Sequence, residues 1–292
     1  MNLRVAMRIG FALWLWFCVV AGLSGCTGPG LVTTPESTPA STPESVALQL
    51  QRLPAFDVLL LGEQHDNPDH QRIALQVVAQ LAARQGLAAL VMEMADRGKT
   101  TQGLPFDANE ADVQRALQWN DSAWPWRAYG PVVMAAVGKG IAVWGGNLPR
   151  NQMRDVMTQV VMDIRLDPQA LKEQQEAIRE GHCNALPESQ IAPMARIQIA
   201  RDIAMAQTIA AAAHNSAPRS VVLLAGHGHV NKLVGIPRHW QNPAARYQAV
   251  RLLGSAQGEP VRVPASASFD AIWPTAPIPP KDYCAEFKAI SR

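Results

Sequence analysis

The sequence has 292 residues, of which 48% are hydrophobic and 17% are charged, enough to bury the core of one large domain. Its formal net charge of +2, without a basic stripe interleaved with aromatic residues, excludes nucleic acid as the expected partner. There is no zinc-type cysteine pair, no P-loop and no glycine-rich dinucleotide fingerprint, so the sequence does not predict the cofactors that those motifs bind.

Residues Met1–Gly25 have the pattern of a bacterial lipoprotein signal peptide. Arg4 and Arg8 form a positive region, and Phe11–Ala21 is apolar but too short to span a bilayer as a stable helix. Small residues then precede Cys26, which resembles a lipobox. We therefore expect cleavage before Cys26, lipidation of that residue and near-irreversible membrane anchoring. An ordinary secretory signal with a chance cysteine is the alternative.

The segment after the signal peptide has the composition of a tether between the membrane and the folded domain. Residues 26–45 are rich in proline, serine and threonine, and such a segment cannot bury enough apolar surface to fold, so we expect a tether. By analogy with other lipoproteins, the absence of aspartate at Thr27 favours the outer membrane. Residues 46–292 are expected to form the folded domain.

Two cysteines remain in the folded part, Cys183 and Cys284. In an oxidising periplasm they can form a disulfide, since exported proteins keep such bonds. Two buried or free thiols are equally compatible with the sequence.

Apolar runs alternate with helical patterns, which predicts an α/β fold with a parallel sheet flanked by helices. Five strands are predicted, at Asp57–Leu61, Ala88–Met92, Ile141–Trp144, Ser220–Leu224 and Tyr247–Leu253. Helices are predicted at Pro68–Gln85 and Pro131–Lys139, and a proline-rich tail after Pro260. Residues Arg150–Ala213 have a helical pattern with two breaks, and we expect a smaller helical lid at about 150–214, between the third and fourth strands.

Each of the first four predicted strands is followed by groups that can do chemistry. They are Glu63 and His65, then Glu93, then Asn147, then His227 and His229. Because the carboxyl ends of parallel strands lie on one edge of a sheet, residues more than 150 positions apart should line a single crevice. Solvated loop charge explains any one of these residues but not all four clusters.

Several short motifs resemble those of the ChaN-type haem-binding lipoproteins. They occur in order from about Leu59 to Pro237: Gly-Glu-Gln-His-Asp-Asn-Pro at Gly62–Pro68, Glu93-Met94, Trp-Pro-Trp with Tyr in Trp124–Tyr129, Asn-Leu-Pro-Arg at Asn147–Arg150, and Gly-His-Gly-His-Val with Gly-Ile-Pro at Gly226–Pro237. The resemblance implies an α/β fold with a helical lid, and a haem site formed in part by a second subunit. It also implies haem or iron acquisition or storage at the outer membrane, with an outer-membrane haem receptor as a further partner.

The resemblance favours a tyrosinate ligand, which suits ferric iron because it is hard and anionic. Only Tyr129, Tyr247 and Tyr283 are available, and Tyr129 is preferred because it stands among tryptophans where a lid should meet the sheet. Packing in the core with a hydrogen-bonded hydroxyl is the other reading of Tyr129.

Further residues are candidates for holding the haem. His182 lies in a break of the helical region, where it can be an axial ligand, contact a propionate, or be an ordinary loop histidine. His229 and Lys232 are candidates for the propionates, and His65 for a contact at the same edge. The methionines of the lid, Met153, Met157, Met194 and Met205, are read as core filler.

A second function remains open, because the Gly-x-x-His pattern occurs twice, at Gly62–His65 and Gly226–His229. The pattern resembles that of erythromycin esterases and proposed metalloproteases. His65, His229 and a carboxylate of Glu63 or Glu93 can hold a divalent transition metal with one open position, leaving the other carboxylate as general base. This alternative is a metal-dependent hydrolase.

Overall fold

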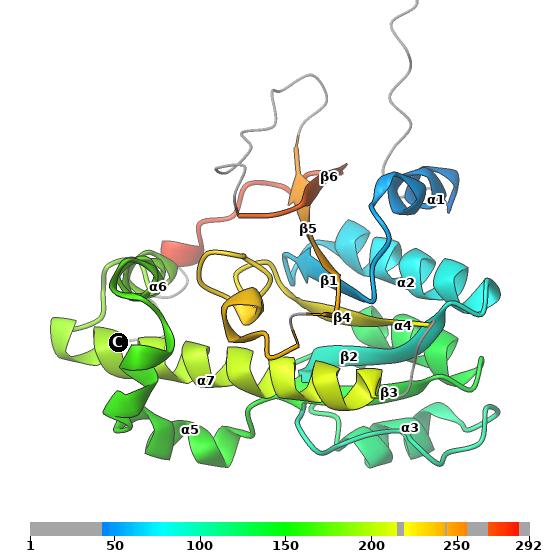
Figure 1. The fold of residues 1–292 in the computed structure, drawn as a ribbon, viewed down its shortest axis with the longest axis horizontal. Helices are drawn as coiled ribbons and strands as arrows, with labels where there is room; N and C mark the ends of the chain where they lie inside the picture. The colour runs from blue at the N-terminus through cyan, green and yellow to red at the C-terminus, as the bar shows by residue number, and fades with distance from the viewer. Residues whose placement is uncertain (1–42, 215–218, 243, 256–267, 286–292) are drawn as a thin grey trace, which may run out of the picture. The chain divides into compact units, whose positions relative to one another are not determined.

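The computed structural model describes residues 43–214, 219–242, 244–255 and 268–285 (Figure 1). The predicted signal peptide, Cys26 and the predicted tether up to residue 42 lie outside these residues. Residues 43–45 were also predicted as tether, but they begin the helix Pro43–Arg52, so the folded part starts three residues earlier than predicted. Among the described helices, none combines the length and apolar character that a membrane crossing requires.

Within the described residues, six parallel strands form one sheet in the order β3-β2-β4-β1-β5-β6. The strands are β1 (Val58–Glu63), β2 (Leu87–Asp96), β3 (Ala142–Asn147), β4 (Ser220–Gly226), β5 (Tyr247–Gly254) and β6 (Ala271–Thr275). The predicted α/β fold is therefore confirmed. The strand β6 was not predicted, because the sequence analysis assigned its residues to a proline-rich tail. It contains Pro274, which an edge strand tolerates because one side of its backbone needs no ladder hydrogen bonds.

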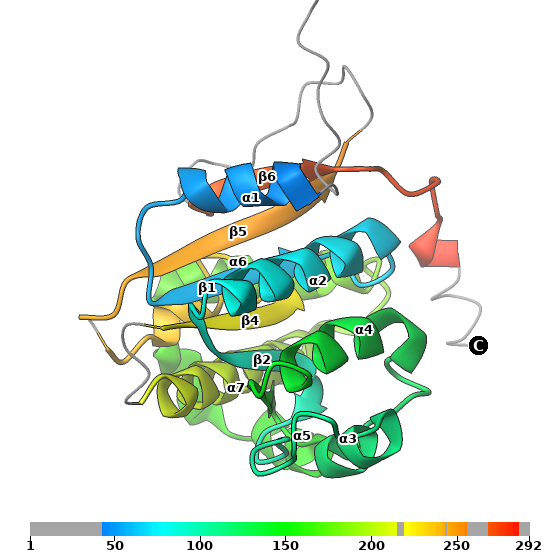
Figure 2. The same cartoon turned by 90° about the vertical axis from the view of Figure 1, so that its right-hand side faces the viewer.

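Helices cover both faces of the sheet. They are α1 (Pro43–Arg52), α2 (Pro68–Ala83), α3 (Glu110–Leu117), α4 (Trp126–Val137), α5 (Arg150–Met157), α6 (Pro168–Gly181) and α7 (Glu188–Ala213), with the 3₁₀ turns η1 (Val160–Arg165) and η2 (Ile236–His239). Figure 2 shows α1, α2 and α4 lying across one face, while α7 lies on the other. Two apolar layers result, one on each face.

The strands are apolar along their length because both of their faces are buried. In β1, Leu59 and Leu61 pack in the layer of α2 and α4, whereas Val58 and Leu60 pack in the layer of α7. All four side chains are 0% exposed. This two-sided burial fixes the register of β1, since a slip by one residue would exchange the two faces.

The helix predicted at Pro131–Lys139 begins earlier, at Trp126, and Pro131 lies inside it. The prediction placed the proline at the first position, where its missing N–H costs nothing. In the structure, the Trp126 indole instead packs directly on Gly130, where an added Cβ would lie 2.6 Å from the indole nitrogen. Contacts of Trp126 with Trp119 then hold the extra turn in place.

The predicted helical region between the third and fourth strands consists of α5, η1, α6 and α7. The first part of α7 packs with α5 and α6, and its later part packs on β2, β3 and β4 (Figure 1). Met205, on that later part, is fully buried, and Met153 and Met194 pack against small apolar clusters, so these methionines fill the core as expected.

Candidate functional site

The first four strands extend two to four residues farther than predicted, so several expected loop residues belong to strand ends. Glu63 ends β1, Glu93 lies in β2, and Asn147 ends β3. The carboxyl ends of these parallel strands lie on the same edge of the sheet, whose central strands are β4 and β1. There the connection after β1 leads toward β2 and the one after β4 leads toward β5, in opposite directions. Ligand crevices of open α/β sheets lie at such a point.

The first glycine of each Gly-x-x-His motif is needed because β1 and β4 pack closely at this edge. A Cβ on Gly62 would lie 2.4 Å from Val230 and 2.9 Å from the backbone of His227. A Cβ on Gly226 would lie 2.9 Å from Nε2 of His65. Each motif therefore leaves room for the other strand's loop, which places the two histidine-bearing segments next to each other.

Glu63 is fully buried and accepts three hydrogen bonds. Its Oε1 atom is 2.8 Å from the Tyr129 hydroxyl and 2.9 Å from Nδ1 of His65, and Oε2 is 3.0 Å from Nε2 of Gln71. Since a carboxylate only accepts, Nδ1 of His65 carries a proton. Burial lowers the pKa of His65, but the hydrogen bond to Glu63 and the charge of Glu93 raise it above its ordinary value.

Glu93 is the second buried carboxylate, and it faces several positive groups. The backbone N–H of Gly226 donates to its Oε2 at 2.7 Å, and the Arg201 guanidinium donates to Oε1. Arg201 also donates to Asn147 at 2.9 Å, so one side chain joins the ends of β2 and β3. Burial raises the pKa of Glu93, but the charges of His229 and Arg201 hold it well below its ordinary value.

His229 pairs with a carboxylate from α7. Its Nδ1 atom lies 2.6 Å from Asp202, and its Nε2 atom lies 3.6 Å from Glu93. Burial lowers the pKa of His229, but the charges of Asp202 and Glu93 raise it to about 9. His229 is therefore a buried imidazolium at neutral pH, fixed between two carboxylates.

A cavity of about 810 Å³ opens above these groups, and we call it the sheet-edge cavity. Its floor contains Glu63, His65, Glu93 and His229, and helix α6 contributes Ala177 and Ile178 to its wall. Its apolar lining exceeds its polar lining, and its size lies within the roughly 300–1,000 Å³ of small-molecule sites. The predicted strand-end residues thus share a cavity large enough for a ligand.

Arg251 provides an incompletely satisfied cation in the sheet-edge cavity. It lies on β5, with its guanidinium 5.6 Å from the centre of the Phe269 ring. Its Nε atom is buried without a hydrogen-bond partner, and burial lowers the pKa of Arg251. A buried donor without a partner costs free energy, so an anionic ligand group here would be stabilised. His227, also in the cavity, has its pKa lowered to about 4 by burial and by the charge of Arg251.

Tyr283 contacts the same cavity from the C-terminal segment. Its hydroxyl donates to Asp66 at 2.7 Å and accepts from Gln64 at 3.1 Å, and its side chain remains 45% exposed. The neighbouring Cys284 forms a disulfide with Cys183, directly after α6. The disulfide, which the sequence left open, therefore holds Tyr283 at the cavity.

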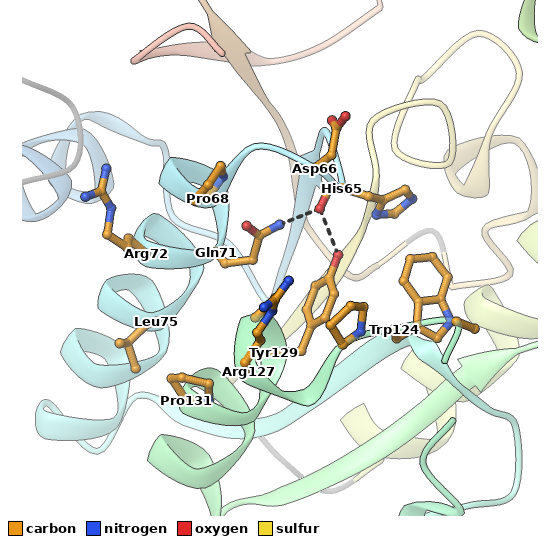
Figure 3. A pocket seen from close by; sticks show the side chains of 13 residues that line it. His65, Asp66, Pro68, Gln71, Arg72, Leu75, Trp124, Arg127, Tyr129 and Pro131 are labelled. Atoms are coloured by element: carbon orange, nitrogen blue, oxygen red, sulfur yellow. Dashed lines mark hydrogen bonds between the residues drawn. The ribbon is translucent and has the colours of Figure 1, made fainter. Parts of the chain in front are cut away.

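The other predicted haem residues occupy different environments. Tyr129 is 1% exposed, and its hydroxyl donates to Glu63 at 2.8 Å. The same hydroxyl also points at the carbonyl of His65 (Figure 3). Burial and the neighbouring Glu63 carboxylate raise the pKa of Tyr129, which opposes the tyrosinate form. In this conformation Tyr129 has the alternative role of a packed tyrosine with a hydrogen-bonded hydroxyl.

His182 and Lys232 lie at the margin of the site. Nδ1 of His182 is 2.8 Å from the Ile178 carbonyl, and His182 follows Gly181, which lines the sheet-edge cavity. Lys232 forms an ion pair with Asp270, so its charge is already neutralised. Tyr247 instead packs on Trp240 at the start of β5.

The metal alternative meets an electrostatic obstacle. His65, Glu93 and His229 do gather, as predicted, yet no group of three or more His, Cys, Asp or Glu among the described residues has metal-binding geometry. Arg201 occupies Oε1 of Glu93, and His229 holds a proton that a metal ligand must lose. The guanidinium and the imidazolium supply the positive charge that a metal would bring.

Three residues of the site were missed from the sequence, Arg201, Asp202 and Arg251, whereas Tyr283 was named as an available ligand but was not preferred. Asp202 had a usable signal, because it falls on the face of α7 that also carries Ile199, Met205 and Ala206, and a charge there needs a buried partner. Nothing in the sequence favoured Tyr283 over Tyr129, since the position of Tyr283 depends on a disulfide between residues 101 positions apart.

Comparison with solved structures gives two similar chains, of which the first shares this fold. A structure of ChaN of Campylobacter jejuni with cofacially bound haem matches with a TM-score of 0.60 and 23% identity, over 78% of this chain and 90% of that chain. An erythromycin esterase variant in its open conformation matches with a TM-score of 0.46 and 14% identity, over 77% of this chain and 80% of that chain. No curated protein sequence matches this chain.

At the level of sequence families, one model matches most of the folded part. It is described as haem-binding uptake, Tiki superfamily, ChaN, and it matches residues 49–240, which is more than half of the chain. These residues include both Gly-x-x-His motifs, Glu93, and the Arg201–Asp202 pair of α7. The chain therefore belongs to the ChaN family of haem-binding proteins.

Proposed function

We propose that this chain binds ferric haem in the sheet-edge cavity, with Tyr283 as the iron ligand and Arg251 as a propionate contact. Family membership supports haem as the cofactor. The observation that carries the proposal is the combination, in one cavity, of a half-exposed tyrosine and a buried guanidinium with an unpaired N–H. When bound, haem supplies a ferric centre, and the protein supplies its ligand and its pocket.

The cavity residues fit the chemistry of haem. The macrocycle needs an apolar wall, which Ile178, Val234 and Phe269 provide. Propionates need cations, and Arg251 lines the cavity without an ion-pair partner among the described residues, whereas Lys232 is paired with Asp270. We therefore propose Arg251, in place of Lys232, as the residue that contacts a haem propionate. His229 remains a buried positive charge beneath the haem.

Tyr283 is a better ligand candidate than Tyr129 in this conformation. The Tyr283 hydroxyl is at the cavity and its side chain is 45% exposed, whereas Tyr129 is 1% exposed. Asp66 accepts a hydrogen bond from the Tyr283 hydroxyl at 2.7 Å and is placed to take its proton when iron binds. Tyr129 would first have to break its hydrogen bond to Glu63 before it could bind iron. His182 remains the candidate histidine ligand at the rim of the cavity.

We further propose that two copies share the haem. The cavity is open to solvent on one side, so one face of a bound macrocycle would stay wet in a single copy. A second copy would remove that face from water, at about 25 cal/mol per Å² of apolar surface. Because only the haem-loaded form has this surface to bury, dimerisation should depend on haem.

The proposed setting is the outer membrane, where the chain would serve haem or iron acquisition or storage, with a haem receptor as a partner. The signal-peptide pattern and Cys26 support this setting. Palmitate labelling of the wild type and of Cys26→Ala in a Gram-negative host tests it. Labelling that depends on Cys26 is expected, and equal labelling of both proteins would exclude the anchor.

Haem binding is tested by titrating haemin into the apo-protein and following the Soret band. We expect a saturable red shift of the Soret band. The Arg251→Gln variant should bind more weakly with the same spectrum, because it loses a propionate contact and keeps the ligand. A Soret response equal to that of buffer would refute the proposal.

A second candidate function is hydrolysis without a metal. Glu63 holds the His65 imidazole with Nδ1 protonated, which leaves Nε2 directed at the cavity, 3.7 Å from Glu93. An imidazole oriented in this way by a carboxylate can act as a general base toward water. A panel of activated esters, assayed with wild type and His65→Gln, tests it. Turnover that survives the substitution would exclude this role.

A further inference from the structure

A second cavity lies on the other side of His65, between α2 and the start of α4 (Figure 3). We call it the Trp124 cleft. Its volume is also about 810 Å³, within the range of small-molecule sites. Apolar atoms dominate its walls, which are formed by Pro68, Leu75, Trp124, Ala128 and Pro131. It shares only His65 and Asp66 with the sheet-edge cavity.

The floor of the Trp124 cleft offers few unused hydrogen bonds. The Tyr129 hydroxyl donates to Glu63, and Nε2 of Gln71 donates to Glu63 and to the His65 carbonyl. The Trp124 ring is itself fixed edge-on against His65, with 4.9 Å between ring centres. A ligand that enters the cleft therefore meets rigid apolar walls, which favour an apolar or aromatic body.

Two charged residues that line the Trp124 cleft, Asp66 and the exposed Arg127, have no ion-pair partner within the described part of the chain, and Asp66 accepts hydrogen bonds from Gln64 and Tyr283. Arg127, in the first turn of α4, forms no side-chain hydrogen bond or ion pair with any described residue, and its side chain lies between Gln71 and Tyr129 in the view of Figure 3. Arg72, on the α2 wall, is instead paired with Asp69. A single unpaired guanidinium beside an apolar wall complements one anionic head group.

We propose that the Trp124 cleft is a second ligand site, which binds an amphipathic monoanion through Arg127 and its apolar walls. The ligand class is a carboxylate or sulfonate carried on an aromatic or aliphatic body. This site is separate from the proposed haem site and does not rest on it, because the two cavities lie on either side of His65 and share only His65 and Asp66 among their lining residues.

The test uses 8-anilinonaphthalene-1-sulfonate as an anionic probe and N-phenyl-1-naphthylamine as its neutral counterpart. Probe fluorescence is measured with the full folded domain, in wild type, Arg127→Ala and the control Arg84→Ala. Arg84 is exposed at the opposite end of α2, so the control removes the same charge away from the cleft. A charge-assisted contact of about 1.5–3 kcal/mol predicts that Arg127→Ala weakens the anionic probe about tenfold or more.

The neutral probe should bind Arg127→Ala and wild type equally, and Arg84→Ala should bind both probes as wild type does. If Arg127→Ala weakens the binding of both probes equally, or weakens the binding of neither, the proposal is overturned. Dodecanoate and benzoate then compete with the probe, and the stronger competitor identifies an aliphatic or an aromatic body.

Haemin separates this site from the proposed haem site. Arg127→Ala should keep the Soret titration of the wild type, and saturating haemin should leave the anionic probe bound. If haemin displaces the probe and Arg127→Ala weakens haemin equally, the cleft is the haem site and the inference of a second site fails. If haemin does not bind at all while the probe result holds, the proposed function fails and the second site stands.

Discussion

The hydroxyl of Tyr283 lies 2.7 Å from a carboxylate oxygen of Asp66, although 217 residues separate them in the sequence. The contact brings the C-terminal segment back to the end of β1, where Glu63 and His65 begin the candidate site. The Cys183–Cys284 disulfide, formed by the neighbour of Tyr283, fixes that segment to the turn after α6. One face of the sheet-edge cavity therefore depends on a covalent link.

Removing this disulfide should lower both stability and haem affinity. In the chain-entropy account, a closed loop of about 100 residues contributes about 4–5 kcal/mol, and measured values are often smaller. The double variant Cys183→Ser/Cys284→Ser should therefore unfold at lower urea, by about 2–4 kcal/mol. It should also bind haemin more weakly, because Tyr283 must then be ordered on binding. Urea titration with intrinsic fluorescence measures the first effect, and unchanged stability would contradict the assigned role of the link.

Arg201 should be needed for folding because it faces Glu93, whose side chain is 2% exposed. Replacing Arg201 by Met leaves a buried carboxylate without its guanidinium, and breaking such a pair costs about 3 kcal/mol. The control Arg179→Met removes ion pairs with Glu176 and Glu188, whose side chains are 55% and 76% exposed, and it should cost much less because water screens exposed pairs. Denaturant curves of both variants measure the difference, and equal losses would refute this electrostatic account.

The buried His229 imidazolium predicts that stability falls at alkaline pH. The folded state holds its proton up to a pKa of about 9, whereas the unfolded state releases it near the ordinary value of 6.5. Between these values the folded state binds more protons, so stability decreases as pH rises, by on the order of 3 kcal/mol in total. The free energy of unfolding should therefore fall from pH 6.5 to pH 9 in the wild type. The free energy of unfolding of His229→Gln should depend less on pH over this range. A wild-type free energy of unfolding that rises from pH 6.5 to pH 9 would contradict the prediction.

Tyr129→Phe separates packing from haem ligation. The substitution keeps the buried ring but removes the hydroxyl that donates to Glu63 at 2.8 Å, so Glu63 loses one of three partners. We expect a loss of about 1–3 kcal/mol in the free energy of unfolding. The haem-bound absorption spectrum should stay that of the wild type, because Tyr283 holds the iron in this account. A changed ligand spectrum would restore Tyr129 as the ligand.

Much of the candidate site could be predicted from sequence because strand ends of parallel sheets share one edge. Glu63, His65, Glu93, Asn147 and His229 were predicted to meet, and all of them contact one network at that edge. The strand boundaries were placed too early, since glycine and acidic residues are poor strand formers and hide the last residues of β1 and β4. Those residues stay in the strands because Gly62 and Gly226 pack closely against the neighbouring loops.

The rest of the site depends on tertiary contacts that leave a weak local signal. β6 was not predicted because Pro274 interrupts it, and only its edge position makes that residue tolerable. Arg201 looked like one more polar residue of a long helix until Glu93 was placed opposite it. The preference for Tyr129 over Tyr283 followed the aromatic cluster, but that cluster buries Tyr129 in the layer of α2 and α4.

The measurement that tests the central proposal most directly is a haemin titration of wild type, Tyr283→Phe and Tyr129→Phe, followed by the Soret band and by light scattering. We predict a saturable Soret shift in wild type, with a rise to the mass of two chains. Tyr129→Phe should give the same spectrum, and Tyr283→Phe should lose the bands of a ferric tyrosinate complex. A wild-type Soret band that never departs from free haemin would contradict haem binding, and an unaltered Tyr283→Phe spectrum would contradict the proposed ligand.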